Sequence, residues 1–533
     1  MGAADWLLSS RERGNAVTRL DRRHDDGSAW TAGNEVHVLV HGASYFPELL
    51  RCIRLTRAGD LLLFTDWRGD PDQVLDDDGS EVSRVLCEAA ARGVVVKGLV
   101  WRSHLDRLSF SEQENRHLGE DIEAAGGECL RDMRVRPGGS HHQKFVVLRY
   151  PGRPDLDVAF VGGIDLCHSR FDGPEHAGDR QPQPMAAVYG DRPPWHDVQL
   201  ALRGPAVGDV ETVFRERWED PTPLSRNPVY RAIDAIRGED RTPGALPAQL
   251  RDPEARGGQT VQVLRTYPKR RAGYPFAPEG ERSIARAYEK VVPHAQSLVY
   301  VEDQYFWSPD VVRCFADALR ANPGLHLIAV VPHHPDQDGR FSLPPNLVGQ
   351  QQALDLVRHA GRDRVAVYGI ENAAGTPVYV HAKVCVIDDV WASVGSDNVN
   401  RRSWTHDSEL SCAVLDEARD PRPPLAVDRF GDGARVFARE LRLTLAREHL
   451  GRRVGDEADL LDPATAFRAF AESAGALDRW YAGGRHGLRP GGRLRPHDPP
   501  RLGPRTLAWA TPLYKAVYDP DARPRSLRRR RAF

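Results

Sequence analysis

The chain has 533 residues, of which 41% are hydrophobic and 28% charged, and its formal net charge is −2. This composition predicts a globular protein of roughly three domains, and the near-neutral charge argues against a general affinity for nucleic acid. There is no run of 18 apolar residues and no apolar segment near Met1, so we expect neither a membrane span nor a signal peptide. Seven scattered cysteines without a CxxC pair predict reduced thiols and a cytoplasmic location.

The predicted elements occur twice along the chain. Residues 45–67 read as an amphipathic helix followed by a buried strand, and residues 283–307 have the same pattern. A second helix–strand unit follows each of them, at 85–101 and 311–332. The strands are runs of Val, Leu and Ile without clean alternation, so both faces of each sheet should be covered. The repeat predicts an α/β fold with two sandwich domains related by a pseudo-two-fold axis.

Each copy then reaches a His-x-Lys sequence on an apolar strand. The first contains His142 and Lys144, and the second contains His381 and Lys383. Residues two apart on a strand point to the same face, so each histidine and its lysine can converge on one group of atoms. Phosphodiester cleavage needs a nucleophile, a proton donor for the leaving alkoxide and cations for the phosphoryl oxygens. Two facing copies would supply all of these groups.

Small residues follow each His-x-Lys strand after a hairpin. The first copy reaches Gly162 and Gly163, and the second reaches Gly395 and Ser396. Such residues let the backbone approach a neighbour or ligand closely, and Asn398 offers a neutral amide beyond the second pair. No group of His, Asp and Glu has the spacing of a divalent-metal site near either motif, so we expect no catalytic metal.

Helices at 204–218 and 431–451 close the two halves, and a further helix at 462–480 begins with Asp462 as its N-cap. The arginine-rich end, RPRSLRRRRAF, is expected to be a solvated disordered tail, with contact to anionic lipid or nucleic acid as the alternative. The predicted parts of the chain are a first domain at 35–222, a linker at 223–258, a second domain at 259–455, and a C-terminal helix and basic tail at 456–533.

These motifs resemble those of the phospholipase D superfamily, whose H-x-K-x4-D signature is complete in His381, Lys383 and Asp388. The resemblance covers roughly residues 35 to 450 and is strongest to the eukaryotic-type branch, through AFVGGIDLC, PWHDVQLALRGPAVGDV, YVEDQYFW, GSDNVNRRSW and DSEL. It implies two tandem phospholipase D-like α/β/α sandwich domains with the active site at their interface. It also implies a covalent phosphohistidine, no metal or other cofactor, and conversion of glycerophospholipids to phosphatidic acid by hydrolysis, or transphosphatidylation to an alcohol.

The resemblance also assigns roles to individual residues. His142 matches the nucleophile and His381 the acid that protonates the leaving group, although a symmetric repeat does not itself say which histidine attacks. The positions that match phosphate-binding residues are Lys144, Lys383, Asp165 and Asn398. The positions that match histidine-orienting carboxylates are Asp197 and Glu409, with Asp407 as an alternative to Glu409.

The first half departs from the signature at Arg149, where an aspartate is expected. Asp388, in the second half, lies seven residues beyond His381, which is roughly 20 Å along a strand and on the opposite face. We therefore predict that Asp388 anchors the hairpin and does not touch the phosphate. The first hairpin is longer, and Asp155 or Asp157 is expected to replace the anchor. The first half-site is thus predicted to be active, and loss of the Arg149 side chain to have little effect.

Three alternatives remain open. A nuclease of the same superfamily is disfavoured because the sequence has no basic stripe, and a cardiolipin-synthase-like enzyme because no membrane helix is predicted. A non-catalytic lipid-binding relative would have lost a histidine or lysine in one half. The expected partner is a phospholipid at a membrane surface, bound by a peripheral monomer. The segment 266–276 is either a lipid-facing loop or, more simply, a solvated inter-domain loop.

Overall fold

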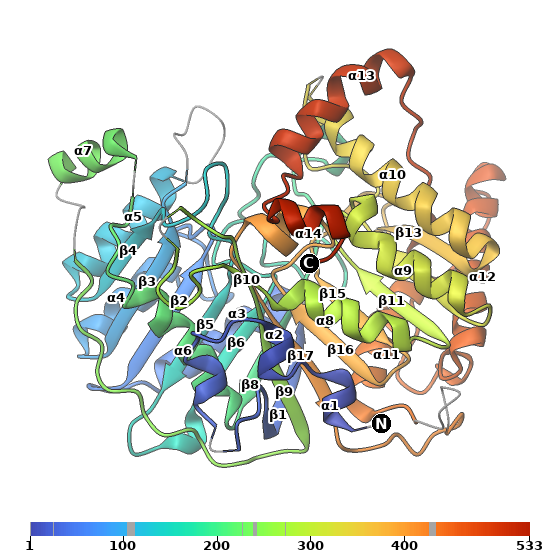
Figure 1. The fold of residues 1–533 in the computed structure, drawn as a ribbon. Coiled ribbons are helices and arrows are strands. Elements are labelled where there is room, and N and C mark those ends of the chain that lie inside the picture. The colour runs from blue at the N-terminus through green and yellow to red at the C-terminus, as the bar shows by residue number, and fades with distance from the viewer. Residues whose placement is uncertain are drawn as a thin grey trace.

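The computed structural model describes residues 2–24, 26–103, 112–225, 227–237, 242–271, 273–339, 341–425 and 433–533. Two mixed α/β halves lie side by side (Figure 1), the first coloured blue to green and the second yellow-green to orange. In these residues no helix is long and apolar enough to cross a bilayer. None of the seven cysteines, all within the described ranges, forms a disulfide.

The first half is built on a seven-stranded sheet in which the first three strands are parallel and the rest are antiparallel. In spatial order the strands are β4 (Glu128–Asp132), β3 (Val95–Trp101), β2 (Leu61–Asp66), β5 (Phe145–Arg149), β6 (Val158–Gly162), β8 (Val198–Arg203) and β1 (Thr31–Val40).

The second half repeats this order and these directions strand for strand. Its strands are β13 (Val365–Glu371), β12 (His326–Val330), β11 (Leu298–Glu302), β15 (Val384–Ile387), β16 (Trp391–Gly395), β17 (Glu409–Asp416) and β9 (Gln259–Tyr267). The last strands of the two sheets, β1 and β9, pair antiparallel at Thr31 with Val261 and at Asn34 with Gln259. The predicted tandem α/β fold with pseudo-two-fold symmetry is confirmed.

Helices cover both faces of each sheet, so the Val-, Leu- and Ile-rich strands are buried on both sides. One face of each sheet forms a core of its own with three helices: α3 (Gly42–Arg54), α4 (Val82–Ala91) and α5 (Glu112–Ala124) in the first half, and α8 (Ser283–Val291), α9 (Pro309–Ala321) and α10 (Leu343–Gly361) in the second. The other faces share a single core with α6 (Ala206–Trp218), α11 (Val436–Leu450) and α12 (Pro463–Ala482).

Helix α6 is completely buried in this shared core, including its charged residues. The predicted apolar stripe that ends at Trp218 is buried, but so is every other residue of the helix. Its charged side chains are therefore paired inside the protein: Arg217 Nε donates to Asp132 at 2.6 Å, and Glu216 accepts from Arg265 Nη1 at 2.6 Å. Buried charges persist only with such partners, so α6 fastens the two halves together as well as closing the first.

The arginine-rich end of the chain is ordered and docks on the second half through its flanking residues, so the prediction of a disordered tail is wrong, although the helix itself is exposed to solvent. It forms α14 (Arg525–Arg530), which lies in red beside the central sheets in Figure 1. Phe533 is buried with its ring 5.3 Å from that of Trp404, and Arg523 donates to Asp310 at 2.9 Å. Aromatic burial and ion pairing offset the ordering entropy that we expected to keep the tail free.

The segment 266–276 is not a solvated loop either. Tyr267, Tyr274 and Phe276 are buried together, and the guanidinium of Arg270 lies 3.6 Å above the ring of Tyr274. The remaining elements are short and connect or extend the two halves. They are α1 (Ala3–Trp6), α2 (Ser10–Arg13), β7 (Trp195–His196), α7 (Pro228–Arg237), β10 (Glu281–Arg282), β14 (Pro377–Val380), β18 (Leu494–Pro496) and α13 (Pro504–Leu513).

Candidate active site

Two short parallel bridges join the halves at equivalent places. His196 of β7 pairs with Val380 of β14, and His141 pairs with Ser408. Each of these four residues directly precedes a predicted histidine or a predicted carboxylate in the sequence. The bridges therefore bring the histidine of each half to the carboxylate of the other half.

The first of these cross-half pairs is His142 with Glu409. Nδ1 of His142 lies 2.9 Å from Oε2 and 3.1 Å from Oε1 of Glu409. Ser396 Oγ donates to Glu409 Oε2 at 2.6 Å, and the backbone N–H of His142 donates to the carbonyl of Ser408 at 2.9 Å. Because the carboxylate holds Nδ1, Nε2 is the ring nitrogen that is left to react.

The second pair is His381 with Asp197, whose Oδ2 lies 2.6 Å from Nδ1. The other oxygen, Oδ1, accepts from the backbone N–H of Val198 at 2.9 Å. The ring of Trp195 packs 5.0 Å from that of His381, which fixes the plane of the imidazole. His142 has 16% of its side chain exposed against 6% for His381, so the first histidine is the more accessible to a ligand.

The small residues predicted after each hairpin leave room for Asp197 and for the neighbouring strands. A Cβ on Gly163 would lie 2.1 Å from Asp197 Oδ1, and one on Gly162 would lie 2.3 Å from Gln199 Oε1. In the second half a Cβ on Gly395 would lie 1.9 Å from Ser411 Oγ. Any larger residue at these positions would displace a strand or a carboxylate.

The two lysines lie beside their histidines, as their two-residue spacing requires. Lys144 Nζ donates to the carbonyl of His142 at 2.9 Å and lies 3.7 Å from Asp165 Oδ1. Lys383 Nζ donates to the carbonyl of His381 and, at 3.3 Å, to Gln304 Oε1. Burial lowers the pKa of Lys383 to about 8, with Lys144 adding to the effect and Asp197 opposing it.

The two other predicted phosphate-binding residues differ in character. The carboxylate of Asp165 accepts from the backbone N–H of Trp67 at 3.1 Å and faces Lys144. It is therefore placed to hold that lysine, because a carboxylate repels phosphate. Asn398 is buried, and its Oδ1 has no hydrogen-bond partner within the described ranges. The NH2 of this amide can still donate to a ligand group.

Burial and charge set the proton balance of the site. Burial lowers the pKa of His142, and Lys144 and Lys383 lower it further. Burial and Lys383 likewise lower the pKa of His381, against the pull of Asp197. Burial raises the pKa of Glu409 to about 8, whereas in Asp197 the charges of His381 and Lys383 outweigh burial and lower the pKa. Burial thus disfavours the protonated form of both histidines, and Asp197 opposes this effect at His381.

Comparison with known proteins decides the family. Residues 75–312 match a family model described as Phospholipase D, and residues 292–420 match one described as Cardiolipin synthase, PLD-like domain. The chain is 26% identical to Phospholipase D alpha 2 of Arabidopsis thaliana over 507 residues, covering 70% of this chain and 61% of that one. It is 25% identical to Phospholipase D1 of Saccharomyces cerevisiae over 499 residues, covering 78% of this chain and 28% of that one.

The chain belongs to the phospholipase D superfamily, in its eukaryotic-type branch. It spans less than two thirds of the length of these curated relatives. The fold is also similar to the crystal structure of a phosphatidylserine synthase from Haemophilus influenzae, with a TM-score of 0.51, 14% identity, and coverage of 84% of this chain and 94% of that one.

Asp388, the last residue of the superfamily signature, lies at the far end of β15 from His381. Its carboxylate accepts from the backbone N–H groups of Gln296, Ser297 and Leu298 at 2.7, 2.8 and 2.8 Å. These groups lie just before and at the start of β11, so the aspartate ties the hairpin to the neighbouring strand, at the opposite end of β15 from the His-x-Lys pair.

Arg149 stands at the equivalent position of the first half and is fully buried. Its Nε donates to Asp157 at 2.8 Å and its Nη1 pairs with Glu211, while Asp157 also accepts from the backbone N–H of Tyr150 at 2.7 Å. Of the two aspartates proposed as replacement anchors, Asp157 holds the turn. The expectation that Arg149 is dispensable is wrong, because its removal would leave two carboxylates buried without their cation.

Asp407, the alternative to Glu409, has other partners. It accepts from the backbone N–H and Oγ of Ser140, each at 2.9 Å, and from Arg402 Nε at 2.6 Å. It therefore holds the loop that leads into His142, while Glu409 contacts the histidine itself.

A basic cavity of about 1030 Å³ opens beside that loop. The residues that line it and carry or can carry charge are Arg136, Lys269, Arg270, Arg271, Arg401, His406, Lys515, Asp521 and Arg528. Sequence analysis missed the cavity because its cations come from four separate segments, although the PKRR run at 268–271 was a signal. Within the described residues, groups of His and Glu with metal-ligand spacing lie behind Asp197 and not at the His-x-Lys pairs.

Proposed function

We propose that this chain is a phospholipase D-type phosphodiesterase. It hydrolyses glycerophospholipids to phosphatidic acid, or transfers the phosphatidyl group to an alcohol, through a covalent phosphohistidine. The observation that carries the proposal is that each His-x-Lys histidine is held at Nδ1 by a carboxylate of the other half, His142 by Glu409 and His381 by Asp197. A non-catalytic lipid-binding relative would have no need for both complete sets.

The more exposed histidine, His142, is the nucleophile of the proposed mechanism. Its Nε2 forms a bond to phosphorus while the bond from phosphorus to the headgroup oxygen breaks. His381, protonated at Nε2, gives its proton to that leaving oxygen. Asp197 stabilises the imidazolium that this step requires, and the arriving phosphodiester anion favours it further. Lys144 and Lys383 neutralise the phosphoryl oxygens.

The second step reverses these roles. His381, now neutral, removes a proton from water or from an alcohol, whose oxygen attacks phosphorus as the bond to His142 Nε2 breaks. The products are phosphatidic acid or a phosphatidyl alcohol, and both histidines return to their starting states. No step uses a metal ion.

The basic cavity supports an anionic substrate, and it also favours a second candidate. Its cations fit the phosphates of a lipid surface, against which a peripheral protein could rest. They fit single-stranded nucleic acid equally well on charge alone, so a nuclease of the same superfamily is the alternative. The superfamily motifs and the phospholipase D relatives favour lipid.

One assay separates these candidates. The protein is incubated with vesicles of phosphatidylcholine and of other phospholipids, with single-stranded DNA and with bis-p-nitrophenyl phosphate, each with and without ethanol. We expect phosphatidic acid, replaced in part by phosphatidylethanol when ethanol is present, and no product from the His142→Ala variant. Cleavage of DNA without any lipid product would favour the nuclease. No product from any substrate, with folded protein, would leave a binding role.

A further inference from the structure

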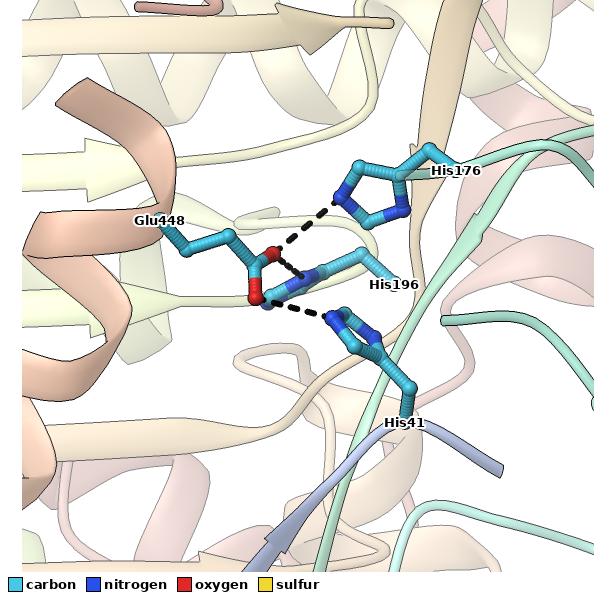
Figure 2. Close-up of side chains that lie close together, drawn as sticks. All are labelled: His41, His176, His196 and Glu448. Carbon is cyan, nitrogen blue, oxygen red and sulfur yellow. Dashed lines mark hydrogen bonds and ion pairs between the residues drawn. The ribbon is translucent and has the colours of Figure 1, made fainter. Parts of the chain in front are cut away.

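A second cluster of ionisable side chains lies behind Asp197 and takes no part in the proposed chemistry. His41 follows β1, His176 lies in the loop after β6, His196 belongs to β7 and Glu448 is on α11. Figure 2 shows the three imidazoles pointing at one carboxylate from separate elements. The three histidines are buried, and Glu448 is 12% exposed. These four residues are spread over more than 400 positions of the sequence, so no local motif identifies them.

The distances are short and converge on one point. His41 Nε2 lies 2.9 Å from Glu448 Oε2, while His176 Nε2 and His196 Nδ1 lie 3.1 and 3.3 Å from Glu448 Oε1. The imidazole centroids are 5.0, 5.0 and 5.8 Å apart. Four ligand atoms held tetrahedrally by bonds of about 2.0–2.2 Å would lie about 3.3–3.5 Å from one another, and three such imidazole rings about 5 Å apart.

The outer nitrogens of two histidines have fixed protons. His176 Nδ1 lies 3.1 Å from the carbonyl oxygen of Trp195, and a carbonyl only accepts, so Nδ1 carries the hydrogen. His196 Nε2 lies 2.6 Å from Glu302 and likewise donates. In their neutral forms both histidines then aim a bare lone pair at the same oxygen, Glu448 Oε1. His41 contacts Glu448 through Nε2 in both of its neutral tautomers, so its position does not show whether a proton or a metal ion lies between them.

Two lone pairs facing a carboxylate repel unless positive charge lies between them. That charge is either extra protons on the imidazoles or one metal ion. A proton on His176 Nε2 or His196 Nδ1 is therefore the competitor that a metal ion must displace.

We propose that His41, His176, His196 and Glu448 form a closed four-coordinate site for a divalent transition metal ion, with Zn²⁺ as the preferred occupant. Three imidazoles and one carboxylate are ligands that zinc takes in tetrahedral sites. The contacts of His196 with Glu302 and of His176 with the Trp195 carbonyl are the outer hydrogen bonds that metal-bound histidines make. Glu302 is itself engaged by His449 at 2.7 Å, so it belongs to the surroundings and not to the ligand set.

The role of this site is to hold the active-site carboxylate in place. His196 precedes Asp197 in the chain, its carbonyl accepts from the backbone N–H of His381 at 2.7 Å, and the N–H of His41 donates to the carbonyl of Asp197 at 2.8 Å. Glu448 comes from the other half, so the metal ion would clamp the halves together beside the Asp197–His381 pair. All four positions are filled by protein, which leaves none for substrate; the ion is structural.

Metal content and spectroscopy test the proposal on the full chain. The protein is stripped with a strong chelator under conditions that keep it folded, and then titrated with Zn²⁺ and with Co²⁺ alone. We expect one equivalent to bind, the visible absorption of four-coordinate Co²⁺ without thiolate charge-transfer bands, and a higher melting temperature in the loaded protein. A folded, stripped protein that takes up no stoichiometric metal would overturn the site and would leave the proposed enzymatic function untouched.

Variants identify the ligands. His176→Gln and Glu448→Gln should each lower the affinity for Zn²⁺ at least tenfold and change the Co²⁺ spectrum. His497→Gln is the matched control: His497 is also buried, but its Nε2 bonds the amide Gln350 at 3.0 Å and faces no carboxylate cluster. The control should bind one equivalent as the parent does. An unchanged spectrum in both ligand variants would contradict the assignment.

A ligand variant that fails to fold would not leave the question open. X-ray absorption of the zinc-loaded parent protein reports the ligands directly, and we expect scattering from three imidazoles and one oxygen. Scattering from fewer imidazoles, or from sulfur, would overturn the site. Activity on bis-p-nitrophenyl phosphate is measured in parallel, because a clamp should affect melting temperature and activity together, whereas the binding data stand even if the protein turns over no substrate.

Discussion

The two histidine–carboxylate pairs are equivalent by topology and different in environment. His381 has a short contact of 2.6 Å to a single oxygen of Asp197, whose pKa is lowered because the charges of His381 and Lys383 outweigh its burial. His142 lies between both oxygens of Glu409, whose pKa burial raises to about 8. The His381–Asp197 pair is thus built around an ionised carboxylate, and the His142–Glu409 pair around a carboxyl whose charged form burial disfavours.

This difference suggests how a duplicated site divides its work. An ionised carboxylate stabilises an imidazolium, which suits the acid and base His381. A nucleophile needs a neutral imidazole with a free nitrogen, and His142 has a lowered pKa and the greater exposure. In the proposed mechanism the repeat therefore duplicates the groups, and their different surroundings favour different roles.

The largest effect is expected from removing the histidines themselves. His142→Ala should abolish turnover of every substrate, because no covalent intermediate can form. His381→Ala should retain much more of the first step with a p-nitrophenyl ester than with phosphatidylcholine, since p-nitrophenolate leaves without a proton. Acid-quenched His381→Ala protein should carry substrate phosphorus on the peptide that contains His142. A label found instead on the His381 peptide of the His142 variant would reverse the roles.

The carboxylates should be unequal. Asp197→Asn should lower kcat by about 10³–10⁴, because the amide cannot stabilise the imidazolium of His381. Glu409→Gln should cost less, on the order of 10–10²-fold, because a protonated carboxyl already bonds His142 as an amide can. The measurement is kcat and KM on phosphatidylcholine, with the melting temperature as a control for folding. Equal losses would remove the proposed division of labour.

The residues that anchor the two hairpins, Arg149 with Asp157 in the first half and Asp388 in the second, also differ. Their removal should change the free energy of unfolding. Arg149→Ala should lower the free energy of unfolding by about 3–5 kcal/mol, since Asp157 and Glu211 stay buried without a cation. Asp388→Ala should cost about 1–3 kcal/mol through unpaired backbone N–H groups.

The control for these two variants is Arg320→Ala, which removes an exposed ion pair with Asp317 and should cost less than about 1 kcal/mol. Denaturant unfolding measures all three. Activity per folded molecule should be retained in each, and a folded Asp388→Ala protein as inactive as His381→Ala would refute the anchoring role.

A smaller effect is expected in the alkaline limb of the pH profile. The ammonium of Lys383 carries its charge below its pKa, which burial lowers to about 8, so phosphate binding should weaken as the pH rises through about 8. Lys383→Arg keeps its charge at higher pH and should move the limb upward, at some cost in rate from the changed shape. The limb of kcat/KM measures this. Glu409 has a similar pKa, and a limb that moves only in Glu409→Gln would assign it to the carboxyl.

The smallest effect is expected from brief treatment with EDTA. The proposed chemistry uses two histidines and two lysines, so removal of loosely bound Mg²⁺ or Ca²⁺ should leave the rate unchanged. An ion at the proposed buried site of Glu448 should be released too slowly to be lost during brief treatment. Full loss of activity that Mg²⁺ or Ca²⁺ restores would contradict the mechanism.

The sequence by itself determined the repeated helix–strand units, the two His-x-Lys strands and the family. These features are local: periodicity marks buried elements, and a two-residue spacing places His381 and Lys383 on one face whatever surrounds them. The family resemblance also identified Asp197 and Glu409 as candidate carboxylates. The seven-residue spacing from His381 predicted that Asp388 lies far from the phosphate and on the opposite face of the strand. No local pattern, however, could say which carboxylate meets which histidine.

Only the tertiary structure decided that pairing. The pairing of β1 with β9 sets the two sheets together, and the bridges His196–Val380 and His141–Ser408 then exchange the carboxylates between the halves. The same packing buried Arg149 between two acids, docked Phe533 and gathered three histidines around Glu448. Apart from the contact of Arg149 with Asp157 in the same hairpin, these contacts join segments far apart in the chain. Their energy depends on burial and partner charge, which no local sequence pattern specifies.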